Sequence, residues 1–312
     1  MGMKKFTALI ITLLIALCCL PLVAGCKFSE EFTLKQDENG NDYYVYSLTG
    51  FTNKIKGEYT IPSEHDGIEV TEIAEQGIIM TGITKLTVPS TIKKIGAAAF
   101  AYNYSLTEVV FEDGIQIDEI AQGLFGYDRA LKSVIIPERV KTIGYAAFLY
   151  CENLEEVTLP QTLETIGIQA FNYTGLKEIT IPKSVHDTET EDGKIFGIGY
   201  AAFHTCEKLK VAKIEAQITE IPAGAFGYCP ALETLYLPKT LKKIDGAYYN
   251  KDEKFVYGHA FHYNTGLKDI YFAGSAAEWN AVAVENEKVT VQTAEYDNSA
   301  IKNATMHYQN AD

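Results

Sequence analysis

The chain has 312 residues, 47% hydrophobic and 22% charged, a balance typical of a folded protein with a large core rather than of a disordered chain. Its formal net charge of −14, without any Lys/Arg run longer than a pair, argues against binding to nucleic-acid phosphates or anionic lipid headgroups.

Residues 1–25 are typical of a secretion signal. Lys4 and Lys5 precede the apolar stretch "FTALIITLLIALCCL", and Pro21 interrupts that stretch short of the roughly 20 residues needed to span a membrane. The stretch ends in "LVAGC", which resembles a bacterial lipobox. This resemblance implies export, lipidation of Cys26 and anchoring at a membrane surface by acyl chains, followed by a tether over residues 26–31.

Residues 32–56 are predicted to form an N-terminal capping hairpin. The segment "FTLKQDENGNDYYVYSL" alternates around Asn39-Gly40, a pair favoured in two-residue hairpin turns.

Residues 57–272 repeat one pattern of about 23 residues, written L-x-x-I-x-I-P-x-x-V-x-x-I-G-x-x-A-F-x-x-C-x-x. The phenylalanine of the pattern recurs at Phe100, Phe125, Phe148, Phe171, Phe203, Phe226 and Phe261. One such turn cannot bury both its faces, so neighbouring copies must stack. The period and the leucine spacing predict a right-handed leucine-rich-repeat β-solenoid with about eight short parallel strands.

In each strand, apolar residues are expected to face inward and every second residue outward. The outward fifth position reads Thr87, Val110, Ile135, Thr158, Thr180, Lys213, Tyr236 and Tyr271. Because tyrosine is enriched at binding hot spots, we expect a ligand nearer Tyr236 and Tyr271 than Thr87.

Two further columns follow the phenylalanines. The cysteines Cys151, Cys206 and Cys229 each stand three residues after a phenylalanine, which favours a buried column over a Cys206–Cys229 disulfide. Tyrosines stand two residues after it, at Tyr102, Tyr127, Tyr150, Tyr173, Tyr228 and Tyr263. We interpret this column as aromatic stacking that stiffens the arm, with a ligand ladder as the alternative.

Two turns carry insertions of ten and twelve residues in the same arm. The first holds "HDTETEDG", with Asp187, Glu189, Glu191 and Asp192, and the second offers the aromatic residues Tyr248, Tyr249, Phe255 and Tyr257. Because only one turn separates them, we expect the loops to emerge roughly 10 Å apart. They predict a ledge that recognises a protein with a basic, partly apolar surface, or else two surface loops without a role.

Metal sites and catalytic centres are not indicated. The acidic segment departs from the EF-hand pattern, and we expect a solvated loop there rather than a calcium site. His259 and His262 are spaced by three, but His262 is interpreted as a solvated solenoid residue. The chain has no G-x-S-x-G, H-E-x-x-H or phosphate-binding loop, so neither an enzyme nor a cofactor is expected.

Residues 273–312 are predicted to form a C-terminal helical cap. Ser275 and Glu278 fit a capping box, Trp279 is placed to cover the last repeat, and "ATMHY" is a candidate closing strand.

Three segments together resemble the BspA-type family of bacterial leucine-rich-repeat surface proteins: "LKEITIP", "VKTIGYAAFLYCENL" and "YFAGSAAEWNAV". The resemblance covers nearly all of residues 57–285 and implies surface display and non-covalent binding of host or neighbouring-cell proteins. We therefore expect a monomeric, adhesin-like surface lipoprotein that binds a protein ligand. The alternative is a glycan-capture lipoprotein serving a transporter or hydrolase.

Overall fold

The computed structural model describes residues 29–49, 55–191, 193–250, 252, 254–291 and 294–309, without the side chains of Thr49 and Phe255. The predicted leader, Cys26 and Asp192 lie outside these residues. Among the described residues, none belongs to a helix long and apolar enough to cross a membrane.

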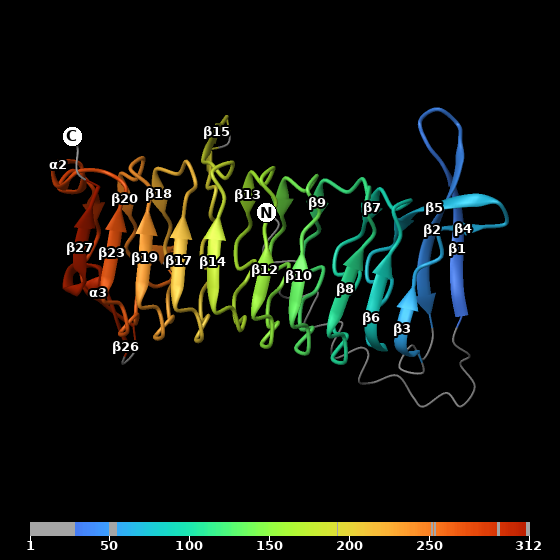
Figure 1. The fold of residues 1–312 in the computed structure, drawn as a ribbon, viewed down its shortest axis with the longest axis horizontal. Helices are drawn as coiled ribbons and strands as arrows, with labels where there is room; N and C mark the ends of the chain where they lie inside the picture. Colours follow the sequence, from blue (N-terminus) through green and yellow to red (C-terminus); the bar gives the residue numbers. More distant parts are fainter. Residues whose placement is uncertain are drawn as a thin grey trace.

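Short parallel strands stand side by side along one face of an elongated molecule (Figure 1). They form two five-stranded sheets that adjoin between β12 and β14, where the amide of Lys177 donates to the carbonyl of Glu155 at 3.3 Å. The strands of this front row are β3 Lys56–Thr60, β6 Gly82–Val88, β8 Glu108–Phe111, β10 Ser133–Ile135, β12 Glu156–Thr158, β14 Glu178–Ile181, β17 Val211–Ile214, β19 Thr234–Leu237, β23 Asp269–Phe272 and β27 Thr305–Tyr308. Eight strands, β6 to β23, carry the predicted outward positions, and β3 and β27 extend the row at its ends.

A second row of two-residue strands stacks in the same order along the other arm of the turns. These strands are β7 Lys94–Ile95, β9 Glu119–Ile120, β11 Thr142–Ile143, β13 Thr165–Ile166, β18 Glu220–Ile221, β20 Lys243–Ile244 and β24 Ala283–Val284. Each turn therefore shares backbone hydrogen bonds with its neighbours on two sides of the core.

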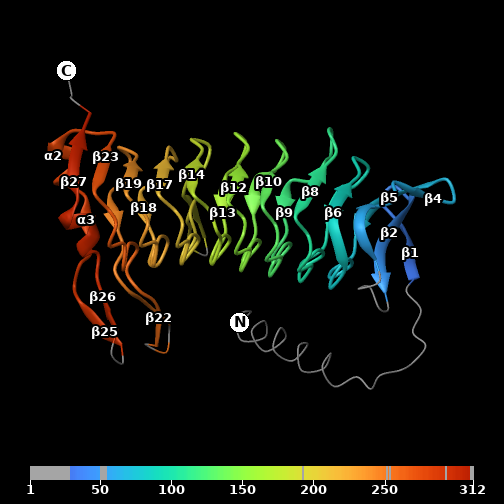
Figure 2. The same cartoon turned by 60° about the horizontal axis from the view of Figure 1, so that its bottom comes forward.

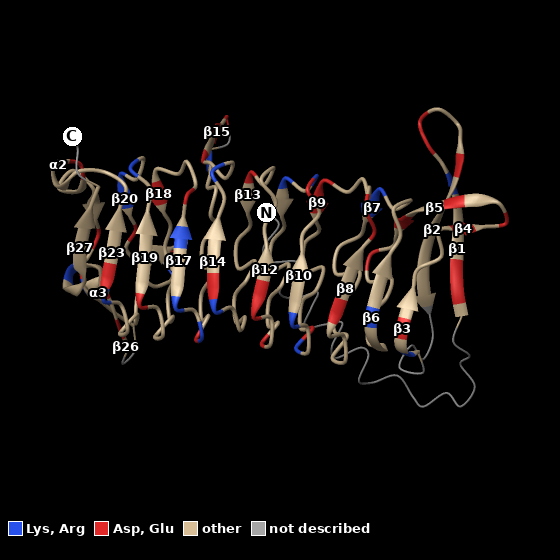
Figure 3. Ribbon diagram, in the orientation of Figure 1, with Lys and Arg blue, Asp and Glu red and all other residues tan. Residues whose placement is uncertain are grey.

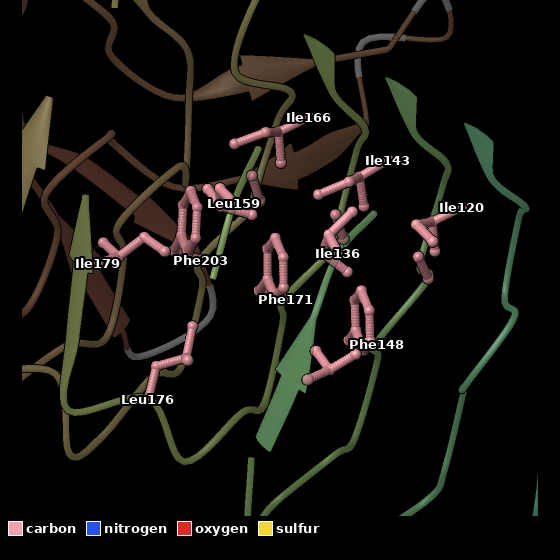
Figure 4. Close-up of a cluster of buried hydrophobic side chains, with 14 of the residues drawn as sticks. Ile120, Ile136, Ile143, Phe148, Leu159, Ile166, Phe171, Leu176, Ile179 and Phe203 are labelled. Carbon is pink, nitrogen blue, oxygen red and sulfur yellow. The ribbon is translucent and has the colours of Figure 1, made fainter. Parts of the chain in front are cut away.

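The core between the two rows is a stack of phenylalanines. All seven predicted rings are fully buried, and neighbouring ring centroids lie 5.1–5.6 Å apart. Figure 4 shows Phe148, Phe171 and Phe203 in line, surrounded by isoleucine and leucine side chains from both rows. The prediction of a repeated buried phenylalanine is confirmed.

The repeat glycines mark places where one turn touches the next. A Cβ atom on Gly199 would lie 2.5 Å from the amide nitrogen of Ile168, and one on Gly167 would lie 2.7 Å from the carbonyl carbon of Gly144. Since the obstructing atoms are backbone, a side chain there would push neighbouring turns apart.

The cysteines are free and buried, as predicted, and they also form hydrogen bonds. The Sγ atoms of Cys151 and Cys229 donate to the carbonyl oxygens of Phe125 and Phe203, at 3.1 and 3.2 Å. Equivalent positions in other turns hold buried Asn103, Asp128, Thr174 and Asn264. In this column the cysteines and Asn103 donate to backbone carbonyls of the preceding turn, whereas Asp128 and Asn264 accept from the backbone amides of Asn103 and Cys229.

An antiparallel hairpin lies at the N-terminal end of the front row (Figure 1). It joins β1 Ser29–Gln36 to β2 Asp42–Thr49, and β2 then pairs with β5 Ile68–Ile73, which also pairs with β4 Glu64–His65 and with β7. The prediction of a two-residue turn was wrong, because residues 37–41 form a five-residue turn. Its shape is set by the Asp37 carboxylate, which accepts from the amides of Asn39 and Asn41 at 2.9 and 2.8 Å.

The C-terminal end contains two short helices, α2 Ala276–Trp279 and α3 Ser299–Asn303, and the hairpin of β25 Val289–Val291 with β26 Ala294–Tyr296. The predicted capping box is present, since the Ser275 amide donates to Glu278 and the Glu278 amide donates back to the Ser275 hydroxyl. Trp279 packs edge-on against Phe272, with ring centroids 5.3 Å apart.

Candidate functional site

The predicted outward residues share one register along the front row. Thr180 pairs with Lys213, Lys213 with Tyr236, and Tyr236 with Tyr271. The same register continues to β27, where His307 pairs with Tyr271. Because side chains alternate along a strand, paired outward residues project from the same face as a row.

Three rings of this row stack on one another, and we call them the aromatic row: Tyr236, Tyr271 and His307. The Tyr236 and Tyr271 centroids lie 4.8 Å apart with 14° between the planes, and those of Tyr271 and His307 lie 4.4 Å apart with 13° between them. The ammonium group of Lys213 lies 5.9 Å from the Tyr236 centroid on its ring face, and Nε2 of His307 lies 2.8 Å from Oδ1 of Asp269. These contacts fix the orientation of each ring, so the row presents ring edges and hydroxyl groups to solvent.

The aromatic row borders an open groove of about 550 Å³ at the carboxyl ends of the strands. The groove is lined by Lys183, Lys213, Ile214, Glu215, Gln217, Tyr236, Leu237, Pro238, Lys239, Thr240, Tyr271, Phe272, Ala273, His307, Tyr308 and Gln309. Tyr236, Tyr271 and Tyr308 are exposed at 37%, 38% and 36%, so large rings stay open to solvent in spite of their mutual packing. The sequence pattern placed two of these residues, Tyr236 and Tyr271, in the site.

The first insertion folds into a hairpin of β15 Thr188–Thr190 and β16 Gly193–Ile195, which rises above the strand ends in Figure 1. Asp187 does not face solvent: its carboxylate accepts from the amides of Gly197 and Thr219 and lies 3.1 Å from the ammonium of Lys194. Burial opposes its ionisation, but these donors outweigh burial and lower the pKa of Asp187. Asp187 is thus a structural anchor of the hairpin, whereas Glu189 and Glu191 are exposed.

The second insertion is the hairpin of β21 Tyr248–Tyr249 and β22 Phe255–Tyr257. Tyr248 and Tyr257 pack against Tyr200 of the arm, with centroid distances of 4.7 and 6.1 Å. Burial of the Tyr200 and Tyr257 rings raises the pKa of each hydroxyl group to about 12. Tyr249 is 42% exposed. Figure 2 shows β22 beside the β25–β26 hairpin at the lower edge of the molecule.

The two insertions meet at Tyr200, since Phe196 at the end of the first also packs against that ring at 5.3 Å. The expected proximity of the loops is therefore present at their bases. Tyr248 and Tyr257, however, pack within the chain, which leaves Tyr249 as the exposed ring among the described side chains of this insertion and weakens the exposure argument for a binding ledge. We place the candidate site in the groove.

The tyrosine column of the arm stacks in the turns where it is continuous. Centroids from Tyr102 through Tyr127 and Tyr150 to Tyr173 are 5.0, 4.9 and 4.5 Å apart. Every member of the column has left-handed backbone, with φ between 55° and 67°. A left-handed backbone conformation costs free energy for residues other than glycine, and the stacking of the rings offsets part of this cost. This geometry accords with the stiffening role.

Both histidines of the pair are buried, so the interpretation of His262 as a solvated residue was wrong. His259 and His262 are 1% and 6% exposed, and His262 packs on Tyr296 at a centroid distance of 4.4 Å. Desolvation lowers the pKa of His262 to about 4. Within the described ranges, no group of three His, Cys, Asp or Glu side chains is arranged to hold a metal ion.

Solved structures with leucine-rich repeats are similar to this chain. A leucine-rich cell-surface protein from Faecalibacterium prausnitzii shares 20% identity over 82% of this chain and 96% of its own, with a TM-score of 0.38. A leucine-rich-repeat protein from Bacteroides ovatus shares 20% identity over 78% of this chain and 85% of its own, with a TM-score of 0.47. The leucine-rich-repeat protein of T. pallidum shares 21% identity over 65% and 78%, with a TM-score of 0.43.

No curated protein matches the sequence. A family model described as the BspA type leucine-rich-repeat region matches residues 71–191 and 192–310, in six copies. These matches span most of the chain and coincide with the stacked turns, so the protein belongs to the BspA-type leucine-rich-repeat family.

Proposed function

We propose that the chain is an adhesin-like surface protein that binds a protein ligand non-covalently through the groove beside the aromatic row. The observation that carries this proposal is the stack of Tyr236, Tyr271 and His307, held at fixed spacing on a rigid sheet and open to solvent. Ordered aromatic side chains lose little conformational freedom on binding, which is why they dominate many protein interfaces.

The ring geometry favours a protein ligand over a neutral glycan. Sugars commonly pack against open aromatic faces, but both faces of Tyr271 are covered, by Tyr236 and by His307. The lining also mixes lysines, a glutamate, glutamines and apolar residues, and it includes no Asp or Asn side chain to hold sugar hydroxyls. A mixed surface with ring edges exposed suits a protein surface.

Export and anchoring form part of the same proposal. The basic start, the apolar stretch and "LVAGC" support cleavage before Cys26 and lipid attachment to it, which would display the protein at the cell surface. We also propose that the turns form a right-handed monomeric solenoid, capped by residues 32–56 and 273–312. The hairpin at one end and the packing of Trp279 on Phe272 at the other support closure of the core.

Affinity capture from host extracellular extracts tests this function. The bait is the chain from residue 27 onward, which retains every described element, and a glycan array is probed in parallel. Tyr236→Ala with Tyr271→Ala should abolish capture. Tyr104→Ala with Tyr145→Ala is the matched control, because these tyrosines are 55% and 38% exposed in other turns.

Two results would count against the proposal. Capture that survives the Tyr236 and Tyr271 substitutions but is lost on substitution at Thr87 would move the site to the other end of the row. Binding on the glycan array without any captured protein would favour the glycan-capture alternative.

A further inference from the structure

The lysines that line the groove form none of the ion pairs that several other lysines of the front row form. Lys239 nevertheless lies near enough to Glu278 to add to the lowering of the pKa of that carboxyl by hydrogen bonds from Ser275. Lys183, Lys213 and Lys239 are all exposed, and none of them forms an ion pair with a residue that the structure describes. Near the amino ends of the strands, by contrast, several lysines pair with glutamates of the adjacent turn. Examples are Lys85 with Glu108 at 2.8 Å and Lys268 with Glu233 at 3.3 Å.

The groove is therefore a basic feature of an acidic protein. The chain has a formal net charge of −14, whereas the groove is lined by three lysines and one glutamate, Glu215. Figure 3 shows the basic segment on β17 among strands such as β12, β14 and β23 that carry acidic segments. A local excess of positive charge in such a background steers negatively charged ligands to this site.

The aromatic row also favours ligands with negatively charged groups. An aromatic ring carries negative charge density on its faces and positive charge density at its edge. Because the faces of Tyr271 are covered and this residue lines the groove, its edge and hydroxyl group are the parts that a ligand in the groove can contact. Carboxylates and the faces of ligand aromatic rings are the groups that such edges attract.

From these observations, and resting on the proposed function, we infer that the groove binds an acidic peptide segment that carries aromatic residues, presented by the partner protein. From Lys213 on β17 to His307 on β27 the row crosses three strand spacings, or about 14 Å at about 4.8 Å each. An extended peptide rises about 3.3 Å per residue, so roughly four residues cover the row. A carboxylate that precedes this segment would reach Lys183, which follows β14, and one within the segment would reach Lys239, which follows β19.

Fluorescence anisotropy with a labelled octapeptide of alternating Glu and Tyr tests the inference, again with the chain from residue 27 onward. Two further probes separate the contributions: alternating Lys and Tyr, and alternating Glu and Ser. The Glu-Tyr peptide should bind more tightly than either of them, and raising the salt concentration should weaken its binding.

Charge reversal supplies the sharper comparison. The triple variant Lys183→Glu, Lys213→Glu and Lys239→Glu should weaken Glu-Tyr binding at least about tenfold, because three attractive contacts become repulsive. The control variant Lys56→Glu, Lys94→Glu and Lys132→Glu changes the net charge equally at exposed sites in other turns. It should change the dissociation constant less than about twofold, since those sites lie beyond the screening length.

Several outcomes would overturn the inference. Equal weakening by the two triple variants would show that only total charge matters, and equal binding of the Lys-Tyr peptide would show that the groove does not select acidic residues. Lysine-dependent binding of a heparin-derived oligosaccharide, without binding of the Glu-Tyr peptide, would identify an anionic glycan instead. If the Tyr236 and Tyr271 substitutions abolish protein capture while the groove-lysine variant captures normally, the proposed function stands and the acidic preference is wrong.

Discussion

Truncation of the Phe148 side chain should allow the turns on its two sides to unfold separately rather than in one cooperative transition. Phe148 is fully buried, and its ring is stacked on both sides, at 5.2 Å from Phe125 and 5.1 Å from Phe171. Replacing a buried phenylalanine by alanine costs about 3–5 kcal/mol through lost burial and the cavity left behind. The upper part of this range is expected, because two ring contacts of about 0.5–1.5 kcal/mol each are lost as well.

The single tryptophan of the chain makes the effect measurable by region. Trp279 lies beside Phe272 at the C-terminal end, so its fluorescence reports on that half, whereas far-ultraviolet circular dichroism reports on all turns. In a repeat protein, weakening one central interface uncouples its two sides. In urea, the circular dichroism and fluorescence transitions of Phe148→Ala should therefore no longer coincide.

A surface substitution provides the control for this experiment. Ile135 is 72% exposed on the front row, so Ile135→Ala should change the free energy of unfolding by no more than about 0.5 kcal/mol. An unfolding midpoint in Phe148→Ala equal to that of the wild type would refute the stacked-core account. Coincident, equally shifted transitions by both probes would refute the uncoupling.

Three further predictions concern other parts of the chain. Cys26→Ala should abolish incorporation of a clickable fatty acid in growing cells, and retained label would rule out lipidation at Cys26. Asp187→Ala should lower the free energy of unfolding by about 2–4 kcal/mol and expose the β15–β16 hairpin to proteolysis. The reason is that Lys194 and two backbone amides lose a largely buried acceptor. An unchanged rate of cleavage would contradict the anchoring role of Asp187. Burial lowers the pKa of His204 to about 4. Between about pH 4 and 6.5 the folded state therefore binds fewer protons than the unfolded state. The free energy of unfolding consequently decreases as the pH falls through this window. In unfolding curves at several pH values, His204→Phe should flatten that dependence by up to about 1.4 kcal/mol per pH unit, and an unaltered slope would exclude His204 as its source.

The repeat made the core and the outward row predictable from sequence. A phenylalanine at a fixed offset in each turn had to be buried between equivalent turns, and Phe148 and Phe171 stack as that spacing requires. The two-residue alternation of strands fixed which side chains face outward, and Tyr236 and Tyr271 consequently stand in register.

The rest of the site depends on contacts that carry no periodic signal. His307 completes the aromatic row from a strand that lies outside the repeat pattern, so no template position marked it as outward-facing. Lys183 and Lys239 follow their strands, where the alternation has ended. The composition of the first insertion suggested a solvated acidic loop, but Asp187 is held by amides of a neighbouring turn, which is a tertiary contact.

The order of the strands determines how far the groove lies from the N-terminal hairpin. The groove is built from the last turns of the row, and the N-terminal hairpin lies at the opposite end (Figure 1). Each whole turn inserted between them would displace the groove by about 4.8 Å along the long axis without altering its lining. The middle turns, from β8 to β12, thus separate the groove from the N-terminal hairpin. With an anchor at Cys26, the number of such turns would set how far from the membrane the binding surface stands.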